Sequence, residues 1–214
     1  MRGIRYGSAW QARFQYGGMQ KPHIIGIGGT LRPASTSELA LRVVLRHAAS
    51  LGATVELLTG EALLLPMYSP ETSARNAPAS LLLAEITRAH GIVLASPGYH
   101  GSLSGLLKNA LDYVEDLRNG PRPYFHDRAV GLIACAYGWQ ATGTTLMAMR
   151  SIVHALRGWP TPMGVAINSA SKQFSEQGTP LDATVDAQLR MLASQVMEFA
   201  VSRAACIQAN AGAP

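Results

Sequence analysis

Cysteine is scarce in this chain of 214 residues, which contains only Cys135 and Cys206, far apart in the sequence. Neither belongs to a CxxC pair or to a cysteine–histidine cluster, so the sequence indicates neither a zinc site nor a disulfide framework. Cys135 stands in an apolar run, and we expect it to be a small core residue. A reducing cytoplasm is the simplest compartment for such a protein.

Long hydrophobic runs are also missing. No apolar stretch approaches the ~18 residues that a membrane span needs, so no membrane partner is predicted. Residues 1–20 lack the apolar stretch of a signal peptide, and they are basic, glycine-rich and aromatic. We expect a disordered extension or an early start codon, with Met19 near the functional start. The alternative is an arm that packs on a partner subunit.

Charged residues make up only 14% of the chain and hydrophobic residues 48%, which indicates a globular protein. The formal net charge is +5, and three of these charges come from Arg2, Arg5 and Arg13 in a segment without acids. The rest of the chain therefore carries +2, an ordinary surface. No run of lysine or arginine occurs, so a nucleic-acid partner is not expected.

Short apolar runs alternate with stretches of helical spacing from residue 22 onward. The alternation predicts a parallel sheet covered by helices on both faces, doubly wound through right-handed crossovers, in a single domain over residues 21–214. Ligands of such sheets bind beyond the carboxyl ends of the strands, so the loops after strands one, three and four matter most. Strands are predicted at 23–28, 54–58, 91–96, 128–136 and 161–168, and helices at 37–51, 79–89, 103–117, 142–156 and 181–206.

The loop after the first strand has the composition of a phosphate site. Its glycines, Gly28 and Gly29, allow close approach of the backbone, and the following helix directs its free N–H groups to the same place. Hydroxyl groups and one guanidinium add further donors to a phosphate dianion. The alternative is a helix cap rich in serine and threonine, with a solvated arginine. The candidate ligands are Thr30, Arg32, Ser35, Thr36 and Ser37.

The kind of phosphate follows from the motifs that this loop fails to match. Gly26 and Gly28 fit the start of a G-x-G-x-x-G dinucleotide fingerprint, but Leu31 occupies its third glycine position. A Walker loop, G-x-x-x-x-G-K-[ST], is not found in the sequence. A hydroxyl-rich loop with one arginine better suits a terminal monophosphate, which weakens the case for a dinucleotide-dependent dehydrogenase.

The loop after the third strand is suited to a flat ring. Backbone N–H groups near Ser102, between two glycines, can meet an electron-rich ring edge that gains negative charge on reduction. Tyr99 and His100 can pack along an aromatic ring, although ordinary loop packing is the alternative for both. Lys108 and Asp112 lie four residues apart and are expected to form a structural pair on one helical face.

Three sequence blocks together resemble the NADPH-dependent FMN reductase family of flavodoxin-like proteins. Residues 29–37 (GTLRPASTS) are similar to the family's G-S-x-R-x-x-S-x-N loop, with Thr30 for the first serine and Ser37 for the asparagine. Residues 97–112 (PGYHGSLSGLLKNALD) match P-x-Y-x-x-S-x-x-G-x-L-K-N-A-[LI]-D nearly throughout, and residues 65–68 (LPMY) resemble a weaker L-P-L-Y block. The resemblance spans roughly residues 22–200.

The resemblance implies a flavodoxin-like five-stranded sheet of order 2-1-3-4-5 and an FMN cofactor with NADPH or NADH as co-substrate. It implies an oxidoreductase that passes electrons to a small-molecule acceptor, namely a quinone, an azo compound, free flavin or oxygen. The family also implies a homodimer or homotetramer. The other interpretation is an FMN-binding electron carrier or redox-sensing module without its own NAD(P)H oxidation. Because the cofactor carries the redox chemistry, no catalytic acid, base or nucleophile is required.

The third loop departs from the family, which often has two adjacent glycines after strand four. This chain reads YGWQATG over residues 137–143, so that Trp139 either caps the flavin and narrows the substrate pocket or packs as an ordinary loop aromatic. By the resemblance, the first loop binds the FMN phosphate, and the second and third loops line the isoalloxazine. The ring-lining candidates are Pro97, Gly98, Tyr99, His100, Gly101, Ser102, Tyr137, Gly138 and Trp139.

Overall fold

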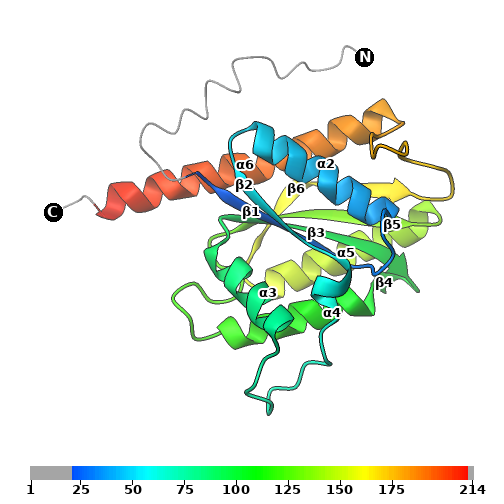
Figure 1. The fold of residues 1–214 in the computed structure, drawn as a ribbon. Coiled ribbons are helices and arrows are strands. Elements are labelled where there is room, and N and C mark those ends of the chain that lie inside the picture. The colour runs from blue at the N-terminus through cyan, green and yellow to red at the C-terminus, as the bar shows by residue number, and fades with distance from the viewer. Residues whose placement is uncertain (1–20, 212–214) are drawn as a thin grey trace.

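A computed structural model describes residues 21–211, with side chains up to residue 206. Its centre is a six-stranded sheet in which the parallel order is β2-β1-β3-β5-β6, and the short β4 pairs antiparallel with β3 (Figure 1). The predicted doubly wound sheet and its strand order are therefore confirmed. The interpretation of residues 1–20 concerns a segment outside the described residues. The strands are β1 (His23–Gly28), β2 (Thr54–Leu58), β3 (Gly91–Tyr99), β4 (Ser102–Leu103), β5 (Ala129–Ala136) and β6 (Trp159–Asn168).

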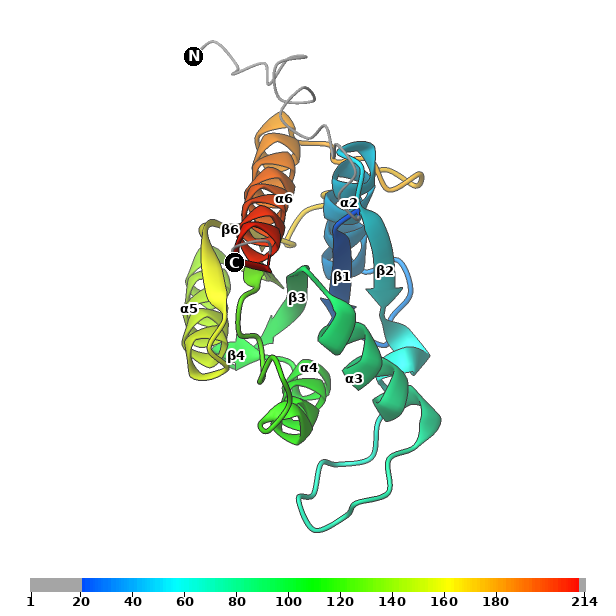
Figure 2. The ribbon, with the colours of Figure 1, turned by 90° about the vertical axis from the view of Figure 1, so that its left-hand side faces the viewer.

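Helices cover both faces of the sheet, as Figures 1 and 2 show. Successive side chains of a strand point to opposite faces, so Ile24 packs with α2 and α6, whereas Ile25 packs with the helices of the other face. The chain thus has two apolar cores, one on each side of the sheet. The helices are α2 (Thr36–Ser50), α3 (Ala77–Arg88), α4 (Gly105–Asp112), α5 (Trp139–Ala155) and α6 (Ala183–Ala211), with 3-10 turns η1 (Gly60–Leu63) and η2 (Tyr113–Leu117).

Most element boundaries differ from the predicted ones by one or more residues, and two of these differences lie beside the predicted ligand loops. The helix expected over residues 103–117 begins at Gly105, because Leu103 pairs with Gly98 in β4 and Ser104 caps the helix by accepting from the Leu107 N–H. Its second half is the 3-10 turn η2. The helix expected from residue 142 begins at Trp139, directly after Gly138, whose φ of +106° favours glycine.

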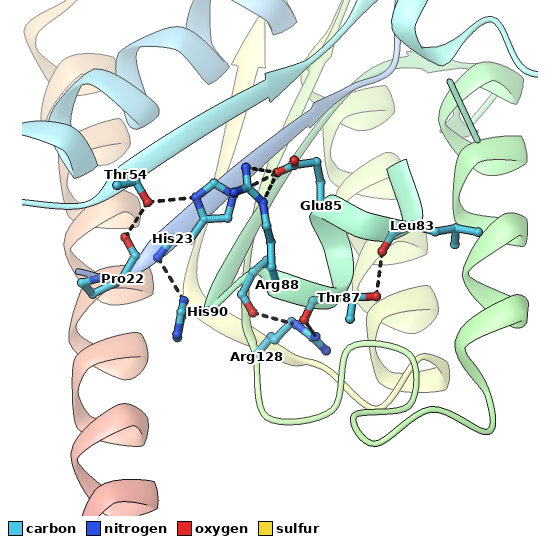
Figure 3. Close-up of polar contacts among 10 residues, drawn as sticks. Pro22, His23, Thr54, Leu83, Glu85, Thr87, Arg88, His90 and Arg128 are labelled. Carbon is cyan, nitrogen blue, oxygen red and sulfur yellow. Dashed lines mark hydrogen bonds and ion pairs between the residues drawn. The ribbon is translucent and has the colours of Figure 1, made fainter. Parts of the chain in front are cut away.

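The amino ends of the central strands carry a network of charged and polar side chains (Figure 3). The imidazole of the buried His23 lies 3.0 Å from Glu85 and 2.9 Å from the Thr54 hydroxyl. Burial acts to raise the pKa of Glu85, but hydrogen bonds from Arg88 and His23 outweigh it and hold that pKa below its ordinary value. The backbone N–H of His23 donates to Nδ1 of His90 at 3.1 Å. The network ties β1 to β2, to α3 and to the turn that leads into β3.

We expect His90 to make the stability of the fold sensitive to acid. Burial first, and then the nearby side chains of Arg122, His23 and Arg128, hold the His90 pKa below its ordinary value. As pH falls, the unfolded chain therefore binds a proton before the folded chain does. The contribution of His90 to the unfolding free energy is fully present above about pH 6.5, the pKa of an unperturbed histidine. It is lost as the pH falls through the pKa that His90 has in the folded chain. Protonated Nδ1 cannot accept the His23 N–H.

The variant His90→Asn retains an acceptor near the Nδ1 position but has no titrating group. Urea denaturation measures the unfolding free energy at about pH 7.5 and about pH 5. Between these two pH values, the unfolding free energy of His90→Asn should fall by about 1 kcal/mol less than that of the wild type. His154→Asn, at an exposed histidine of α5, is the matched control. An unchanged pH dependence in His90→Asn would contradict the role of His90.

Candidate functional site

The first predicted loop lies at the amino end of α2, where the helix leaves N–H groups free. Ser35 caps the helix, since its hydroxyl oxygen accepts from the Glu38 N–H at 3.2 Å. Within the described part of the chain, the N–H groups of Thr36 and Ser37 have no hydrogen-bond partner. Such a helix end, with the positive end of its dipole, attracts an anion.

Arg32 adds a full positive charge to this helix end. Its backbone N–H donates to the Thr30 hydroxyl at 3.1 Å, which shapes the turn. Its guanidinium is exposed, and no carboxylate among residues 21–206 pairs with it. An unpaired guanidinium beside free backbone donors is suited to bidentate contact with phosphate oxygens.

The second loop is a tight hairpin between β3 and β4. Gly98 pairs with Leu103 and Tyr99 with Ser102, so the turn consists of His100 and Gly101, both with positive φ, at +51° and +84°. Both residues in the left-handed region are typical of a type I′ turn. The hairpin holds Tyr99 at the surface, with 56% of the residue exposed.

Buried hydroxyl groups fix the base of this hairpin. Ser96 accepts from the Ser104 N–H at 2.9 Å, and Thr145 of α5 donates to the Ser102 carbonyl at 3.3 Å. A Cβ built on Gly98 would lie 2.6 Å from the Thr145 hydroxyl oxygen and 3.0 Å from the Ala136 side chain. Only glycine therefore lets the hairpin approach α5 this closely.

A pocket of 310 Å³ forms where these loops meet at the carboxyl ends of the strands. Arg32 is the one charged residue among its lining residues, and several of the others bear hydroxyl groups. Nine of the fourteen predicted cofactor ligands line it, together with four residues that the sequence did not single out. The lining consists of Thr30, Arg32, Ser35, Thr36, Ser37, Pro97, Gly98, Tyr99, Cys135, Ala136, Tyr137, Ala141 and Ser169.

The other five predicted ligands do not line this pocket. His100 and Gly101 form the tip of the hairpin and are exposed, and Ser102 lies on its return strand. Gly138 precedes α5, and Trp139 is the first residue of that helix, with 68% of the residue exposed. Their role in binding stays a prediction.

Cys135 lies near the end of β5, and Tyr137 directly follows that strand. Both residues line the pocket. Tyr137 is 82% exposed and lines the pocket after β5, the strand next to β3 in the sheet. Cys135 is buried, as expected, and burial raises the pKa of its thiol to about 12. The thiol is therefore neutral at physiological pH and does not react as a thiolate.

The rest of the second sequence block supports a neighbouring loop. Asn109 accepts from the Tyr68 N–H at 2.9 Å and donates to the Pro66 carbonyl at 2.9 Å. Arg75 lies against the rings of Tyr68 and Tyr113. These contacts hold residues 65–68 (LPMY) against α4 and η2. The expected pair of Lys108 and Asp112 is also present, at 2.6 Å, on the exposed side of α4.

Asn109→Ala is expected to lower the unfolding free energy by about 2 kcal/mol, because the Leu65 carbonyl and the Tyr68 N–H lose their side-chain partner. The Pro66 carbonyl keeps the Tyr113 hydroxyl as a donor. Urea denaturation measures this loss. Limited proteolysis should show faster cleavage within residues 64–76. Asn119→Ala, at an exposed asparagine, is the control. Equal stability and equal cleavage in Asn109→Ala and wild type would refute the role of Asn109 in holding residues 65–68.

Across residues 21–206, no three histidine, cysteine or acidic residues gather in a way that could bind a metal ion. None of the helices in the described part of the chain is long and apolar enough to cross a membrane.

Comparison with protein families matches residues 22–172 to the model of NADPH-dependent FMN reductase. Among characterised relatives, an FMN-dependent NADPH-azoreductase of Staphylococcus aureus is 32% identical over 110 residues. These residues are 50% of this chain and 55% of that protein, so the chain spans about half the length of the curated relatives it matches.

Solved structures of flavoenzymes share the fold. The NAD(P)H:(acceptor) oxidoreductase FerB of Paracoccus denitrificans superposes with a TM-score of 0.71 at 17% identity, over 85% of this chain and 98% of that one. The apo form of an NADH:FMN oxidoreductase, EMOB, gives 0.64 at 18% identity, over 85% and 90% of the two chains. At these identities the superpositions establish the shared fold alone.

Proposed function

The chain belongs to the NADPH-dependent FMN reductase family, and we propose that it is an NAD(P)H-dependent oxidoreductase that binds FMN in the 310 Å³ pocket. The single observation that carries this proposal is the donor set at the amino end of α2. It combines free backbone N–H groups, hydroxyl groups and a guanidinium that no described carboxylate pairs with, and none of the described lining residues carries a carboxylate. Such a set fits a phosphate dianion.

The residues present also fit the rest of an FMN molecule. Arg32, Ser35 and Ser37 would hold the phosphate, while Tyr99 and Tyr137 would contact the ring system from the two sides of the pocket. FMN, when bound, supplies the redox chemistry between NAD(P)H and an acceptor such as a quinone, an azo compound, free flavin or oxygen. The protein's own part is to bind the cofactor, orient it and leave one side accessible. The neutral Cys135 thiol adds no charge beside the ring.

The finer expectations belong to the same proposal. We infer one FMN-binding domain over residues 21–214, a cytoplasmic location and a homodimer or homotetramer. Large exposed side chains near the pocket support an assembly, since Tyr99, Tyr137, Trp139 and Met147 are each more than half exposed.

The proposal is tested on the purified full chain. It should be yellow, or become so on reconstitution with FMN, and its flavin absorbance should bleach when NADPH is added without oxygen. Steady-state NAD(P)H oxidation is then screened with a quinone, an azo dye and free FMN. A colourless protein that does not bind added FMN would overturn the proposal. Bound FMN without NAD(P)H oxidation would instead indicate an electron carrier.

A further inference from the structure

A second cavity lies between α2 and α6, on the face of the sheet that these two helices cover. Its volume is 540 Å³, larger than the 310 Å³ of the flavin pocket, and the two cavities share no lining residue. Arg46 follows the first residue of α2 by ten positions, which places it ~15 Å along the helix from the flavin pocket. The cavity is lined by Val43, Arg46, His47, Ser50, Thr179, Pro180, Leu181, Ala183, Asp186 and Arg190.

Two guanidinium groups enter this cavity from different helices. Arg46 of α2 donates one N–H to the Gly178 carbonyl at 3.0 Å, and no carboxylate in the described structure pairs with it. Arg190 of α6 donates its Nε–H to Asp186 at 2.8 Å, which leaves its terminal N–H groups available. With Asp186 counted, the three groups carry a net charge of +1. This excess of donors and positive charge is suited to an anion.

Apolar side chains form another part of the cavity lining. They come from Val43 of α2 and from Pro180 and Leu181 in the segment before α6. A matching molecule has an anionic group and a carbon skeleton.

His47 also lines the cavity, and its pKa responds to charges there. Its imidazole is half-buried, 3.5 Å from the Ser194 hydroxyl oxygen. Burial and then Arg190 lower the His47 pKa, whereas Asp186 acts to raise it. An anion bound beside it should raise this pKa, because the anion favours the protonated imidazole.

We propose that the cavity between α2 and α6 binds a small organic phosphate. The phosphate contacts Arg46 and Arg190, and the carbon skeleton packs against Val43, Pro180 and Leu181. A phosphate, rather than a carboxylate, has enough oxygens to bridge two guanidinium groups and leave one for solvent. This site is independent of the flavin pocket and of its function.

Isothermal titration of the full chain saturated with FMN tests the proposal, with ribose 5-phosphate, inorganic phosphate and ribose as probes. Saturation with FMN keeps the probes out of the flavin pocket. Ribose 5-phosphate should bind more tightly than inorganic phosphate, and ribose should not bind. Arg46→Met and Arg190→Met should each weaken ribose 5-phosphate about tenfold or more.

Two control variants separate this site from others. Arg118→Met removes an exposed arginine elsewhere and should leave binding unchanged. Arg32→Met should weaken FMN but not ribose 5-phosphate at this cavity. A nuclear magnetic resonance titration of the His47 imidazole supplies a readout on each variant that folds, and its pKa should rise on binding. Failure of ribose 5-phosphate to bind, or binding unaffected by Arg46→Met and Arg190→Met, would overturn the proposal.

Discussion

Arg128→Met is expected to lower the free energy of unfolding by about 3–5 kcal/mol, since it removes a buried charged donor that four carbonyl groups share. The Arg128 side chain is fully buried at the amino end of β5. Its guanidinium donates to the carbonyls of Ala89 at 3.0 Å and Thr87 at 2.9 Å, at the end of α3. It also donates to the carbonyls of Tyr124 and His126 in the loop before β5.

The charge of Arg128 is part of this contact. The final carbonyls of α3 form the negative end of the helix dipole, which a cation stabilises. Burial, and then the neighbouring Arg122, lower the Arg128 pKa to about 10, so the group is still charged at neutral pH. Methionine fills a similar volume but can satisfy none of the carbonyls. Arg128→Lys is expected to recover little, because one ammonium group cannot reach carbonyls on two sides.

Arg122→Met is the matched control for this prediction. Arg122 is only half-buried, and its Nε has no hydrogen-bond partner among the described residues. It shares the Ala89 carbonyl with Arg128. We expect less than half of the loss seen for Arg128→Met. Urea denaturation measures both variants, with an unchanged denaturant slope showing that the two-state transition is preserved. Equal losses in the two variants would show that the buried carbonyls do not depend on Arg128.

The role of Arg128 illustrates what the sequence did not reveal. The residue stood at the predicted start of a strand, where an arginine is commonly solvated. Its burial depends on the end of α3 and on a loop in which Tyr124 and Asp127 adopt positive φ, at +54° and +61°. Tyrosine and aspartate do not identify this backbone conformation in a sequence, because glycine is the residue most often found there. The contact arises only when three separate segments meet.

The sheet itself was predictable because its central strands β1, β3 and β5 are buried on both faces over most of their length. Such strands form continuous apolar runs. β1 and the more exposed edge strand β2 were predicted with the observed boundaries. The hairpin of β3 and β4 was missed. A two-residue turn is usually signalled by Asn-Gly, and here His100 takes the first position. The predicted helix therefore began two residues too early.

The candidate site was predictable in part for a topological reason. Parallel strands bring the loops at their carboxyl ends together, so residues from three distant loops could be assigned to one pocket. Ser169 was missed because the loop after β6 was not considered, although β6 is the neighbour of β5. Cys135 was assigned to the core alone, yet it belongs both to the core and to the lining of the pocket.

Arg32→Ala is expected to weaken FMN binding by about 1.5–3 kcal/mol, the range for hydrogen bonds to charged groups, which is a factor of about 10 to 150 in Kd. This prediction rests on the proposed function. The guanidinium has no partner within residues 21–206 to lose, so the substitution leaves no buried group unsatisfied. The unfolding free energy of the apoprotein should therefore change little, by less than about 0.5 kcal/mol.

This separation between affinity and stability is what distinguishes a phosphate ligand from a solvated arginine beside a helix cap. Fluorescence titration of FMN into the apoprotein measures Kd, with Arg118→Ala as the control for loss of one exposed positive charge. Because the contact is ionic, the difference in Kd between wild type and Arg32→Ala should also shrink as salt is raised. Riboflavin, which lacks the phosphate, should bind wild type and Arg32→Ala equally. If Arg32→Ala weakens riboflavin as much as FMN, the guanidinium acts on the ring or on the loop and not on the phosphate.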